Sequence, residues 1–350
     1  MRNMATIDKN FKVETSIHKS DIQFYDVRKA PFSVHGVQYE NGQFRRMPAA
    51  VAKAVSENVH ILHAHTAGGR VRFCTDSPYI AIHAKMPTLG KMPHFAFTGS
   101  IGMDLYVTEN EEQVFVKTFV PPVDITDGYE SVIEVGDGGM REYTLNMPLY
   151  SAVSELYVGL SDTAKVQAPT PYVNEKPVVF YGSSITQGAC ASRAGNCYEA
   201  ILSRRFHMDY INLGFSGAAK GEDVMIDYLA SLDMSVFVCD YDYNAPHAAH
   251  LAATHEKLFK AVRAAHPTTP VIFMTRPKWY LDEENTKCRA VVRQTYDNAK
   301  AAGDKNVYFL DNRALLAQCG NEGTVEGVHP NDYGFYSMAA AVGDVLEKLI

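Results

Sequence analysis

The sequence predicts a two-domain protein in which a jelly-roll-like antiparallel β-sandwich precedes an α/β domain with a parallel five-stranded sheet. Three observations lead to this fold class. A chain of 350 residues exceeds the usual size of one domain. Up to about Tyr172 apolar and polar residues nearly alternate, which indicates half-buried strands, whereas later short apolar runs alternate with helical segments. We therefore expect the sandwich within residues 1–172 and the α/β domain within residues 173–350.

The strands of the first domain are predicted from alternating segments that turn residues separate. The clearest are "RVRFCTDSPYIAIHAKM" (Arg70–Met86), "DLYVTENEEQVFVKTFV" (Asp104–Val120) and "YTLNMPLYSAVSELYVGL" (Tyr143–Leu160). Only Met47–Val55 has a helical pattern in this half. The segment Lys165–Pro177 holds three prolines, and we interpret it as the linker between the domains.

The second domain is predicted from short apolar runs suited to buried parallel strands, with helical patterns between them. The predicted strands lie in Lys176–Gly182, Asp209–Gly217, Met234–Asn244, Pro270–Pro277 and Asn306–Asn312. The predicted helices are Glu222–Ser231, His247–His266, Asn285–Ala302 and Asn331–Ile350. Repeated alternation of strand and helix favours a parallel sheet between two layers of helices.

The composition restricts the partners and the cellular location. It is 46% hydrophobic and 21% charged, which is typical of a globular protein. The net charge of -7 argues against nucleic acid or an anionic membrane as partner, and no apolar run approaches the roughly 20 residues of a membrane helix. The six cysteines form no CxxC pair, and "MRNMATIDKNFKVETS" lacks the pattern of a secretion signal. We therefore expect a cytoplasmic protein with free thiols.

Polar residues gather where the predicted parallel strands end. Ser184 follows the first strand, Gly217 the second and Asn244 the third, while His329 lies in "VEGVHPND" just before the last helix. Ligands of such sheets bind beyond the carboxyl ends of the strands. We therefore expect these residues to share one rim of the domain.

This set of residues suits acyl transfer. A serine needs an adjacent base to act as nucleophile, and His329 is a candidate for that base. Glu326, three residues earlier, is a candidate for orienting the imidazole. The backbone N–H groups of Ser184 and Gly217 and the side-chain amide of Asn244 are candidate donors to a developing oxyanion.

Four short motifs carry a resemblance to a known superfamily. The stretches "GSSITQG", "GFSG", "DYDYN" and "EGVHPND" occur in order and resemble the four blocks of the SGNH (GDSL) hydrolases. By position the resemblance implies Ser184 as nucleophile, Gly217 and Asn244 as oxyanion donors, and His329 as base. It covers the second half of the chain, from about Lys176 onward.

The motifs depart from the superfamily pattern in three places. Ser183 stands where an aspartate is usual, and "DYDYN" replaces the usual Gly-x-Asn-Asp. Glu326 replaces the usual aspartate and is one methylene longer, which changes how it reaches His329.

The first half also resembles a known domain. "TAGGRVRF" and "GMDLYV" resemble the Gly-x-Asp-Leu-Tyr β-domain that precedes a subset of these hydrolases. The two-domain arrangement is similar to carbohydrate esterases of families two and seventeen, the acetylmannan type of family seventeen being the closer. The resemblance implies a serine esterase that deacetylates manno-oligosaccharides first and xylo-oligosaccharides second. It implies neither a metal nor an organic cofactor.

Two residues are candidates for binding the sugar. Trp279, the only tryptophan, follows the fourth predicted strand, and an indole packs well against the C–H face of a sugar. It could equally anchor the interface between the domains. Asp104 and Tyr106 of "GMDLY" either support the sandwich or help to close the substrate cleft.

Other interpretations of the chemistry-bearing residues are weaker. On a strand only His63 and His65 of "HILHAH" share a face, so a metal site with His60 is not favoured. The turn "GSSITQG" lacks the Gly-Lys-Ser/Thr of a phosphate-binding loop. Cys190 and Cys197 have no recognisable base to activate them.

Three rival functions share part of this evidence. A sugar O-acyltransferase would use the same catalytic residues and exclude water. A lipase would need a long apolar loop near the motifs, and the sequence has none there. A carbohydrate-binding protein with an inactive enzyme domain is the alternative from another class. The expected partner in each carbohydrate case is an acetylated oligosaccharide, and association into a homo-oligomer stays open.

Overall fold

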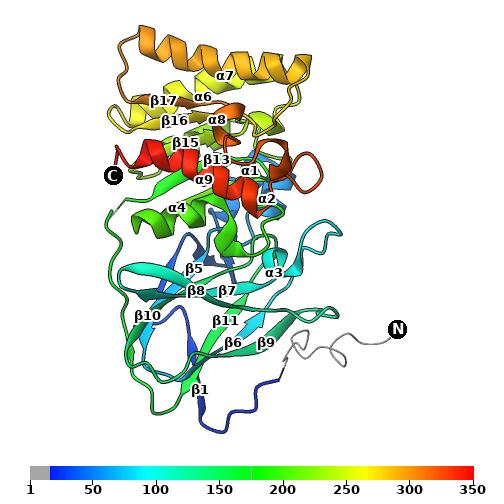
Figure 1. The fold of residues 1–350 in the computed structure, drawn as a ribbon. Helices are drawn as coiled ribbons and strands as arrows, with labels where there is room; N and C mark the ends of the chain where they lie inside the picture. The colour runs from blue at the N-terminus through cyan, green and yellow to red at the C-terminus, as the bar shows by residue number, and fades with distance from the viewer. Residues whose placement is uncertain (1–15, 175) are drawn as a thin grey trace.

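The computed structural model describes residues 16–174 and 176–350 and contains the two predicted parts, which confirms the fold class (Figure 1). In Figure 1 the β-sandwich occupies the lower half and the α/β domain the upper half. Within the described residues, every helix falls short of the length or the hydropathy that a bilayer-spanning helix requires.

The sandwich contains two antiparallel sheets. Its strands are β1 (Ile22–Asp26), β2 (Ser33–His35), β5 (Arg70–Thr75), β6 (Tyr79–Lys85), β7 (Met103–Glu109), β8 (Glu112–Phe119), β9 (Gly128–Glu134), β10 (Arg141–Asn146), β11 (Glu155–Ser161) and β12 (Val166–Gln167). One sheet has the order β1-β11-β6-β9, and the other has the order β12-β5-β10-β7-β8 with β2 paired to β5. A separate hairpin joins β3 (Gln38–Glu40) to β4 (Gln43–Arg45), and the short helix α3 (Phe97–Ser100) precedes β7.

Strand β7 shows how the sandwich meets the α/β domain. Side chains alternate between the two faces of a strand. Met103, Leu105 and Val107 point into the core between the sheets. Asp104 and Tyr106 point the other way and are equally buried, because this outer face of the sheet packs on the α/β domain.

The α/β domain contains one parallel sheet. Its strands are β13 (Val178–Gly182), β14 (Tyr210–Gly214), β15 (Val236–Asp240), β16 (Val271–Met274) and β17 (Val307–Leu310). Its helices are α4 (Tyr198–Phe206), α5 (Asp223–Ser231), α6 (Ala248–Ala265), α7 (Glu283–Ala301), α8 (Asn312–Leu315) and α9 (Asp332–Leu346), with the 3₁₀ turns η3 (Ala194–Asn196), η4 (Asp242–Asn244) and η5 (Gly320–Gly323). The strand order β14-β13-β15-β16-β17 reverses direction at β13. Ligands of α/β folds bind at such a switch point.

Helices cover both faces of this sheet (Figure 1). Val179 and Tyr181 of β13 pack in a hydrophobic cluster with residues of α5, α6 and α7. Val178 and Phe180 pack on the opposite face with residues of α4 and α9. Because both faces are covered, β13 is buried along its whole length, which agrees with its uninterrupted apolar run.

Two helices of the N-terminal half belong to the core of the α/β domain. The predicted helix in Met47–Val55 is α1 (Ala49–Val55), and the sequence analysis missed the next helix, α2 (Glu57–Leu62). Ser56 separates them and caps α2, since its side chain accepts the Val59 N–H at 3.2 Å. Ala52 and Val59 pack in the same cluster as α5. The interpretation of "HILHAH" as a strand was therefore wrong.

Candidate active site

Ser184 and His329 meet at the switch point of the parallel sheet. Ser184 is the second residue after β13, and its Oγ lies 2.9 Å from Nε2 of His329. Nδ1 of His329 lies 2.7 Å from Oε1 of Glu326. The order of hydroxyl, imidazole and carboxylate is that of an activated serine nucleophile, a base and a group that orients the base.

The loop before α9 holds His329 by its own hydrogen bonds. The N–H of Val325 donates to the carbonyl of His329 at 2.9 Å, and the φ of +90° at Gly327 allows the tight turn between them. Oε1 of Glu326 also accepts the backbone N–H of His329 at 2.7 Å. The longer side chain of glutamate therefore fits here, since one carboxylate oxygen binds both the backbone and the ring of His329.

The charge state of Glu326 suits this role. Partial burial raises the pKa of its carboxyl, but the two hydrogen bonds from His329 outweigh that effect, with the nearby His94 adding to them, and the pKa falls below its usual value. The carboxylate is therefore ionised at neutral pH. It holds the proton on Nδ1 of His329 and leaves the Nε2 lone pair facing Ser184.

Three candidate donors to an oxyanion follow neighbouring strands of the sheet. The strands β14, β13 and β15 are neighbours, so Gly217, Ser184 and Asn244 follow adjacent strand ends. Among the described residues, no acceptor binds the backbone N–H of Gly217 or of Ser184. The amide of Asn244 donates to the carbonyl of Phe215 at 2.8 Å and keeps its second hydrogen free to serve as a donor. This arrangement suits an oxyanion hole.

Gly217 needs to be glycine for a backbone reason. Its φ is +67°, in the left-handed region that favours glycine, and open space lies where a Cβ would stand. The residue is exposed, so its N–H borders solvent.

Buried hydrogen bonds within the α/β domain hold the turn that carries Ser184. Ser183, at the position where an aspartate is usual, is buried. Its Oγ accepts the N–H of Ile185 at 3.2 Å, a hydrogen bond within the turn itself. The hydroxyl of Thr186 donates to Oδ2 of Asp240 at 2.9 Å. Burial, together with the neighbouring Asp242, raises the pKa of Asp240 to about 8, so this carboxyl carries a proton at neutral pH.

The sandwich domain reaches the same turn with two side chains. The hydroxyl of Tyr150 donates to the carbonyl of Ser184 at 3.2 Å. Nδ1 of His65 accepts from Nε2 of Gln187 at 3.1 Å, while Oε1 of Gln187 accepts the N–H of Ser216 at 3.1 Å. Burial lowers the pKa of His65 to about 3, so it is a neutral acceptor. Sequence reasoning gave neither residue this role: no motif surrounds Tyr150, and His65 was considered only as a metal ligand within "HILHAH".

Arg46 is a third contribution from the N-terminal half. It is 3% exposed and lies at the end of β14, where its guanidinium donates to the carbonyls of Asn212 and Gly214. It also donates to the carbonyl of His65 at 2.9 Å and lies 4.7 Å from the ring centroid of Phe215. Burial lowers its pKa to about 9. Arg46 therefore ties the end of α2 to the start of the loop that carries Gly217.

Asp104 is buried at the boundary between the domains, which favours its supporting role over the predicted contact with substrate. It is 0% exposed, and its carboxylate accepts from Nδ2 of Asn146 at 2.8 Å and from the N–H of Gly195 at 2.7 Å. The hydroxyl of Tyr106 lies 3.3 Å from Nη2 of Arg193. Both residues of the "GMDLY" motif therefore anchor the sandwich on the turn η3 of the α/β domain.

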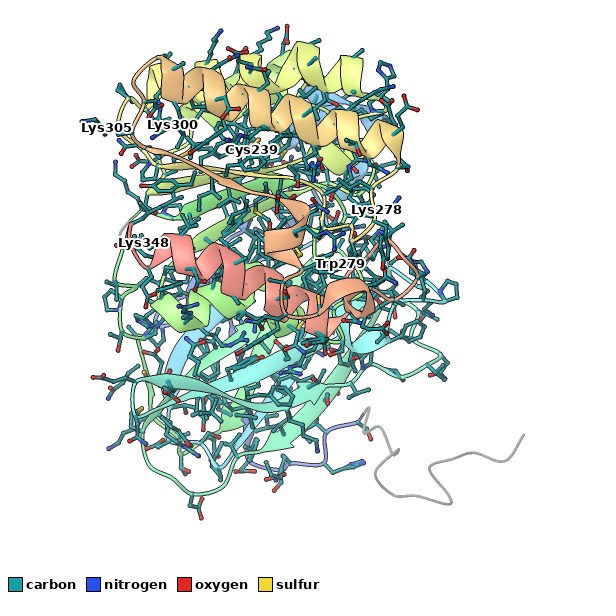
Figure 2. The ribbon with its side chains drawn as sticks, turned by 45° about the horizontal axis from the view of Figure 1, so that its top comes forward. Cys239, Lys278, Trp279, Lys300, Lys305 and Lys348 are labelled. Atoms are coloured by element: carbon teal, nitrogen blue, oxygen red, sulfur yellow. The ribbon has the colours of Figure 1, made fainter. Side chains whose placement is uncertain are left out.

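Trp279 lies in the loop after β16, beside the segment that leads to α9 (Figure 2). The guanidinium of Arg313 lies 3.9 Å from the centroid of its ring and occupies one face. Gly320 approaches the same indole. These two neighbours belong to the α/β domain, so they give no support to the interpretation of Trp279 as a domain anchor. Its contact with a sugar stays a prediction.

The histidines of "HILHAH" are used separately. Nε2 of His63 lies 2.7 Å from Nη1 of Arg45, and the ring of His60 stacks on that of His63, whereas His65 binds Gln187. Burial lowers the pKa of His63 to about 4. The three rings therefore share no metal position.

A different cluster of metal-ligating side chains borders the serine. Within the described residues, His94, Cys190 and His329 form a group whose ligand atoms all lie within 4.8 Å of one another. Burial and the nearby Glu326 raise the pKa of Cys190 to about 12, so its thiol is protonated and is no rival nucleophile to Ser184.

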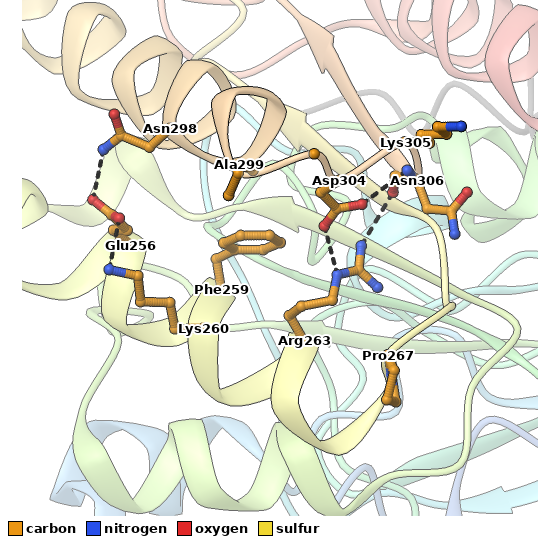
Figure 3. Close-up of a pocket in the computed structure, with 12 residues that line it drawn as sticks. Glu256, Phe259, Lys260, Arg263, Pro267, Asn298, Ala299, Asp304, Lys305 and Asn306 are labelled. Carbon is orange, nitrogen blue, oxygen red and sulfur yellow. Dashed lines mark hydrogen bonds and ion pairs between the residues drawn. The ribbon is translucent and has the colours of Figure 1, made fainter.

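A hollow lies at the opposite edge of the sheet, away from Ser184 (Figure 3). Its volume is about 740 Å³, and Asn306 and Pro267 in its lining precede the amino ends of β17 and β16. Figure 2 shows Lys300 and Lys305 at that end of the domain and Trp279 at the other. Four of the charged groups that line it are paired, Arg263 with Asp304 at 2.7 Å and Lys260 with Glu256 at 2.8 Å. This hollow is separate from the catalytic rim.

The family comparisons agree with this site. Residues 175–347 match the GDSL-like lipase/acylhydrolase family. Residues 22–166 match the GxDLY domain, described as the N-terminus of SGNH-hydrolase-type esterases. The fold and the site thus define an SGNH-type esterase. More particularly, the second domain belongs to the GDSL-like lipase/acylhydrolase family, and a GxDLY domain precedes it. No curated protein matches it.

Solved structures repeat the arrangement over nearly the whole chain. A protein of Bacteroides ovatus ATCC 8483, assigned as a GDSL-like lipase, is 28% identical with a TM-score of 0.84, over 94% of this chain and 98% of that one. The salicylyl-acyltransferase SsfX3 of a tetracycline biosynthetic pathway is 19% identical, with a TM-score of 0.76 over 95% and 98%. A family two carbohydrate esterase mutant from Clostridium thermocellum is 15% identical, with a TM-score of 0.63 over 91% and 98%. The last two show the fold alone.

Proposed function

We propose that this esterase removes O-acetyl groups from acetylated hemicellulose oligosaccharides, with manno-oligosaccharides as first substrate and xylo-oligosaccharides as second. The observation that carries the proposal is the continuous series of hydrogen bonds from Ser184 through His329 to Glu326 beside three donors. The choice of an acetylated sugar draws support from the likeness to a family two carbohydrate esterase. The choice of mannan depends on the similarity of the two-domain arrangement to the acetylmannan type of family seventeen.

In the proposed reaction Oγ of Ser184 attacks the acetyl carbonyl while Nε2 of His329 takes its proton. The carbonyl oxygen becomes an oxyanion that accepts from the N–H groups of Ser184 and Gly217 and from the amide of Asn244. His329 then protonates the departing sugar hydroxyl, which leaves an acetyl ester on Ser184. Water, activated by His329, attacks this ester and releases acetate.

Glu326 has a part in both halves of this cycle. When His329 holds two protons its ring is a cation, and the carboxylate 2.7 Å from Nδ1 stabilises that charge. The same contact keeps Nε2 directed at the serine, so the base needs no reorientation between acylation and deacylation.

A second candidate is a sugar O-acyltransferase, and one observation favours it. The salicylyl-acyltransferase is more similar in fold, with a TM-score of 0.76, than the family two esterase, with 0.63. Both reactions pass through an acyl group on Ser184, and they differ in whether water or an acceptor hydroxyl attacks it. We further propose that the protein acts on imported oligomers in the cytoplasm.

The test is acetate release from mixed acetylated manno- and xylo-oligosaccharides, followed by mass spectrometry. We expect successive losses of acetyl groups from the mannan set, and fewer from the xylan set. Adding unacetylated oligosaccharide as an acceptor separates the two candidates, because an acyltransferase would move acetyl groups to the acceptor instead of releasing acetate.

The matched control is a pair of serine variants. Ser184→Ala removes the nucleophile and should abolish acetate release. Ser235→Ala removes a buried hydroxyl just before β15, at the far edge of the sheet, that has no partner among the described residues, and it should retain activity. Cleavage of a simple aryl acetate without loss of acetyl from either sugar set would keep the esterase and refute the choice of substrate.

A further inference from the structure

Three segments bring metal-ligating side chains together beside the catalytic serine. His94 belongs to the loop between β6 and α3 of the sandwich, Cys190 follows the turn of Ser184, and His329 precedes α9. Their ligand atoms lie within 4.8 Å of one another, and the rings of His94 and His329 have centroids 5.9 Å apart. Neither His94 nor Cys190 has a role in the reaction as derived above.

The chemistry of this set suits zinc and similar thiophilic ions. Zn²⁺ binds imidazole nitrogen at about 2.0–2.1 Å and thiolate sulfur at about 2.3 Å, so the ligand atoms of a tetrahedral site lie roughly 3.5 Å apart. The separations here have to shorten by about 1.3 Å at most to reach that geometry. His94 is exposed on a loop, so a change of its rotamer can supply this movement.

The second shell of such a site is already present. Histidine ligands usually donate their other ring nitrogen to a carboxylate, which fixes the ring and strengthens the bond to the metal. Nδ1 of His329 lies 2.7 Å from Glu326, so Nε2 is the nitrogen that would ligate, in exchange for its 2.9 Å contact with Oγ of Ser184. Three protein ligands would leave the fourth position of the ion to water.

We propose that His94, Cys190 and His329 bind a thiophilic divalent cation such as Zn²⁺, and that the bound ion inhibits the esterase reversibly. This inference rests on the proposed role of His329 as base. On binding, the thiol of Cys190 releases its proton to solvent and its sulfur bonds to the ion. The Nε2 lone pair of His329 bonds to the same ion, so the hydroxyl of Ser184 loses its proton acceptor and attack stops.

The functional test measures aryl acetate hydrolysis against increasing ZnCl₂, with each rate divided by that variant's own rate in chelator. We expect Zn²⁺ to inhibit the wild-type enzyme, EDTA to restore it, and Mg²⁺ to have no effect, because Mg²⁺ prefers oxygen ligands. His94→Ala and Cys190→Ala should each raise the inhibitory Zn²⁺ concentration about tenfold or more. His18→Ala, an exposed histidine at the far end of the sandwich, is the matched control and should leave it unchanged.

A spectroscopic test is independent of activity. Co²⁺ bound to a thiolate gives a near-ultraviolet charge-transfer band, which we expect for the wild type and not for Cys190→Ala. If the band is missing from the wild type, or if both variants keep wild-type sensitivity to Zn²⁺, the site is refuted while the esterase stands. If the band forms but no ester is cleaved, the proposed function fails and the metal site stands.

Because His94 is exposed, its alanine variant will fold even if the buried Cys190 variant does not. A His94→Ala enzyme with unchanged inhibition by Zn²⁺ and an unchanged Co²⁺ band would therefore overturn the proposed ligand set on its own.

Discussion

The two domains contribute different kinds of residue to one site. The α/β domain supplies the groups that we propose take part in the reaction, and these lie at strand ends and in loops, as Ser184, Gly217 and His329 do. The sandwich half supplies buried groups that hold those loops, among them Arg46 and Tyr150. A domain that carries no catalytic atom can therefore still determine the geometry of catalysis, and substitutions in the two regions should have effects of different size.

The largest effect is expected from His329→Ala, on the catalytic side of the comparison. Without a base the hydroxyl of Ser184 keeps its proton, so kcat should fall by about 10⁴-fold or more. The measurement is aryl acetate hydrolysis at saturating substrate, with circular dichroism to verify folding. A loss below about tenfold would mean that His329 is not the base.

Asn244→Ala tests the proposed oxyanion hole. Removing one donor from such a site costs about 10²–10³-fold in kcat. KM should change little, because the donor acts most strongly on charge that develops in the transition state. If instead KM rose 10²–10³-fold and kcat stayed constant, Asn244 would contribute to substrate binding and not to the oxyanion hole.

Asp240→Asn tests whether the buried carboxyl of Asp240, which supports the turn of Ser184 from within the α/β domain, is protonated in the folded protein. The pKa of Asp240 is raised to about 8 in the folded protein, whereas the unfolded chain ionises near the ordinary value of 3.8. Between these values the unfolded state loses the proton and the folded state keeps it, so this group makes the wild type less stable as pH rises.

In urea titrations at pH 5 and pH 8 the wild type should therefore lose on the order of a few kcal/mol that Asp240→Asn does not lose. Parallel pH profiles for the two proteins would show that Asp240 is ionised in the fold. That result would leave the hydrogen bond from Thr186 as a bond to a carboxylate.

Arg46→Lys tests the contribution of the sandwich half. A lysine keeps the charge but cannot donate to several carbonyls at once in the planar arrangement of the guanidinium. We expect kcat to fall about tenfold with KM nearly constant, because the loop of Gly217 loses its anchor at Gly214. A purely structural role would lower the melting temperature and leave kcat per folded molecule unchanged.

Tyr150→Phe should give the smallest effect. It removes one neutral hydrogen bond to the carbonyl of Ser184, worth about 0.5–1.5 kcal/mol, and keeps the packing of the ring. The expected change in kcat is a few-fold, measured on the same aryl acetate. A loss as large as that of Asn244→Ala would end the distinction between catalytic and supporting residues.

The contact between Ser184 and His329 could be predicted from sequence because both residues lie in loops at one rim of the sheet. A parallel sheet places the carboxyl end of every strand on that rim, so the loops that carry Ser184, Gly217 and Asn244 follow neighbouring strands. The supporting residues carry no such pattern. His65 was assigned to a strand, and Asp104 was left as either a support of the sandwich or a substrate contact, because their partners Gln187 and Gly195 are distant in sequence.

The short helix α2 was missed for a related reason. Six residues are too few to show a helical period, and the cap by Ser56 is a weak signal alone. Its stability comes from burial of Val59 against the other domain, which only the tertiary structure reveals.

The packing of α1 and α2 in the core of the α/β domain has a consequence for folding during synthesis. The ribosome completes these helices long before it makes β13, β14 and α5, the elements against which they pack. Until then Met47, Ala52 and Val59 face water or other chains, so the nascent N-terminal half holds an unfinished apolar surface. We therefore expect a chain truncated after β12 to give an aggregation-prone fragment and not an independently soluble sandwich domain.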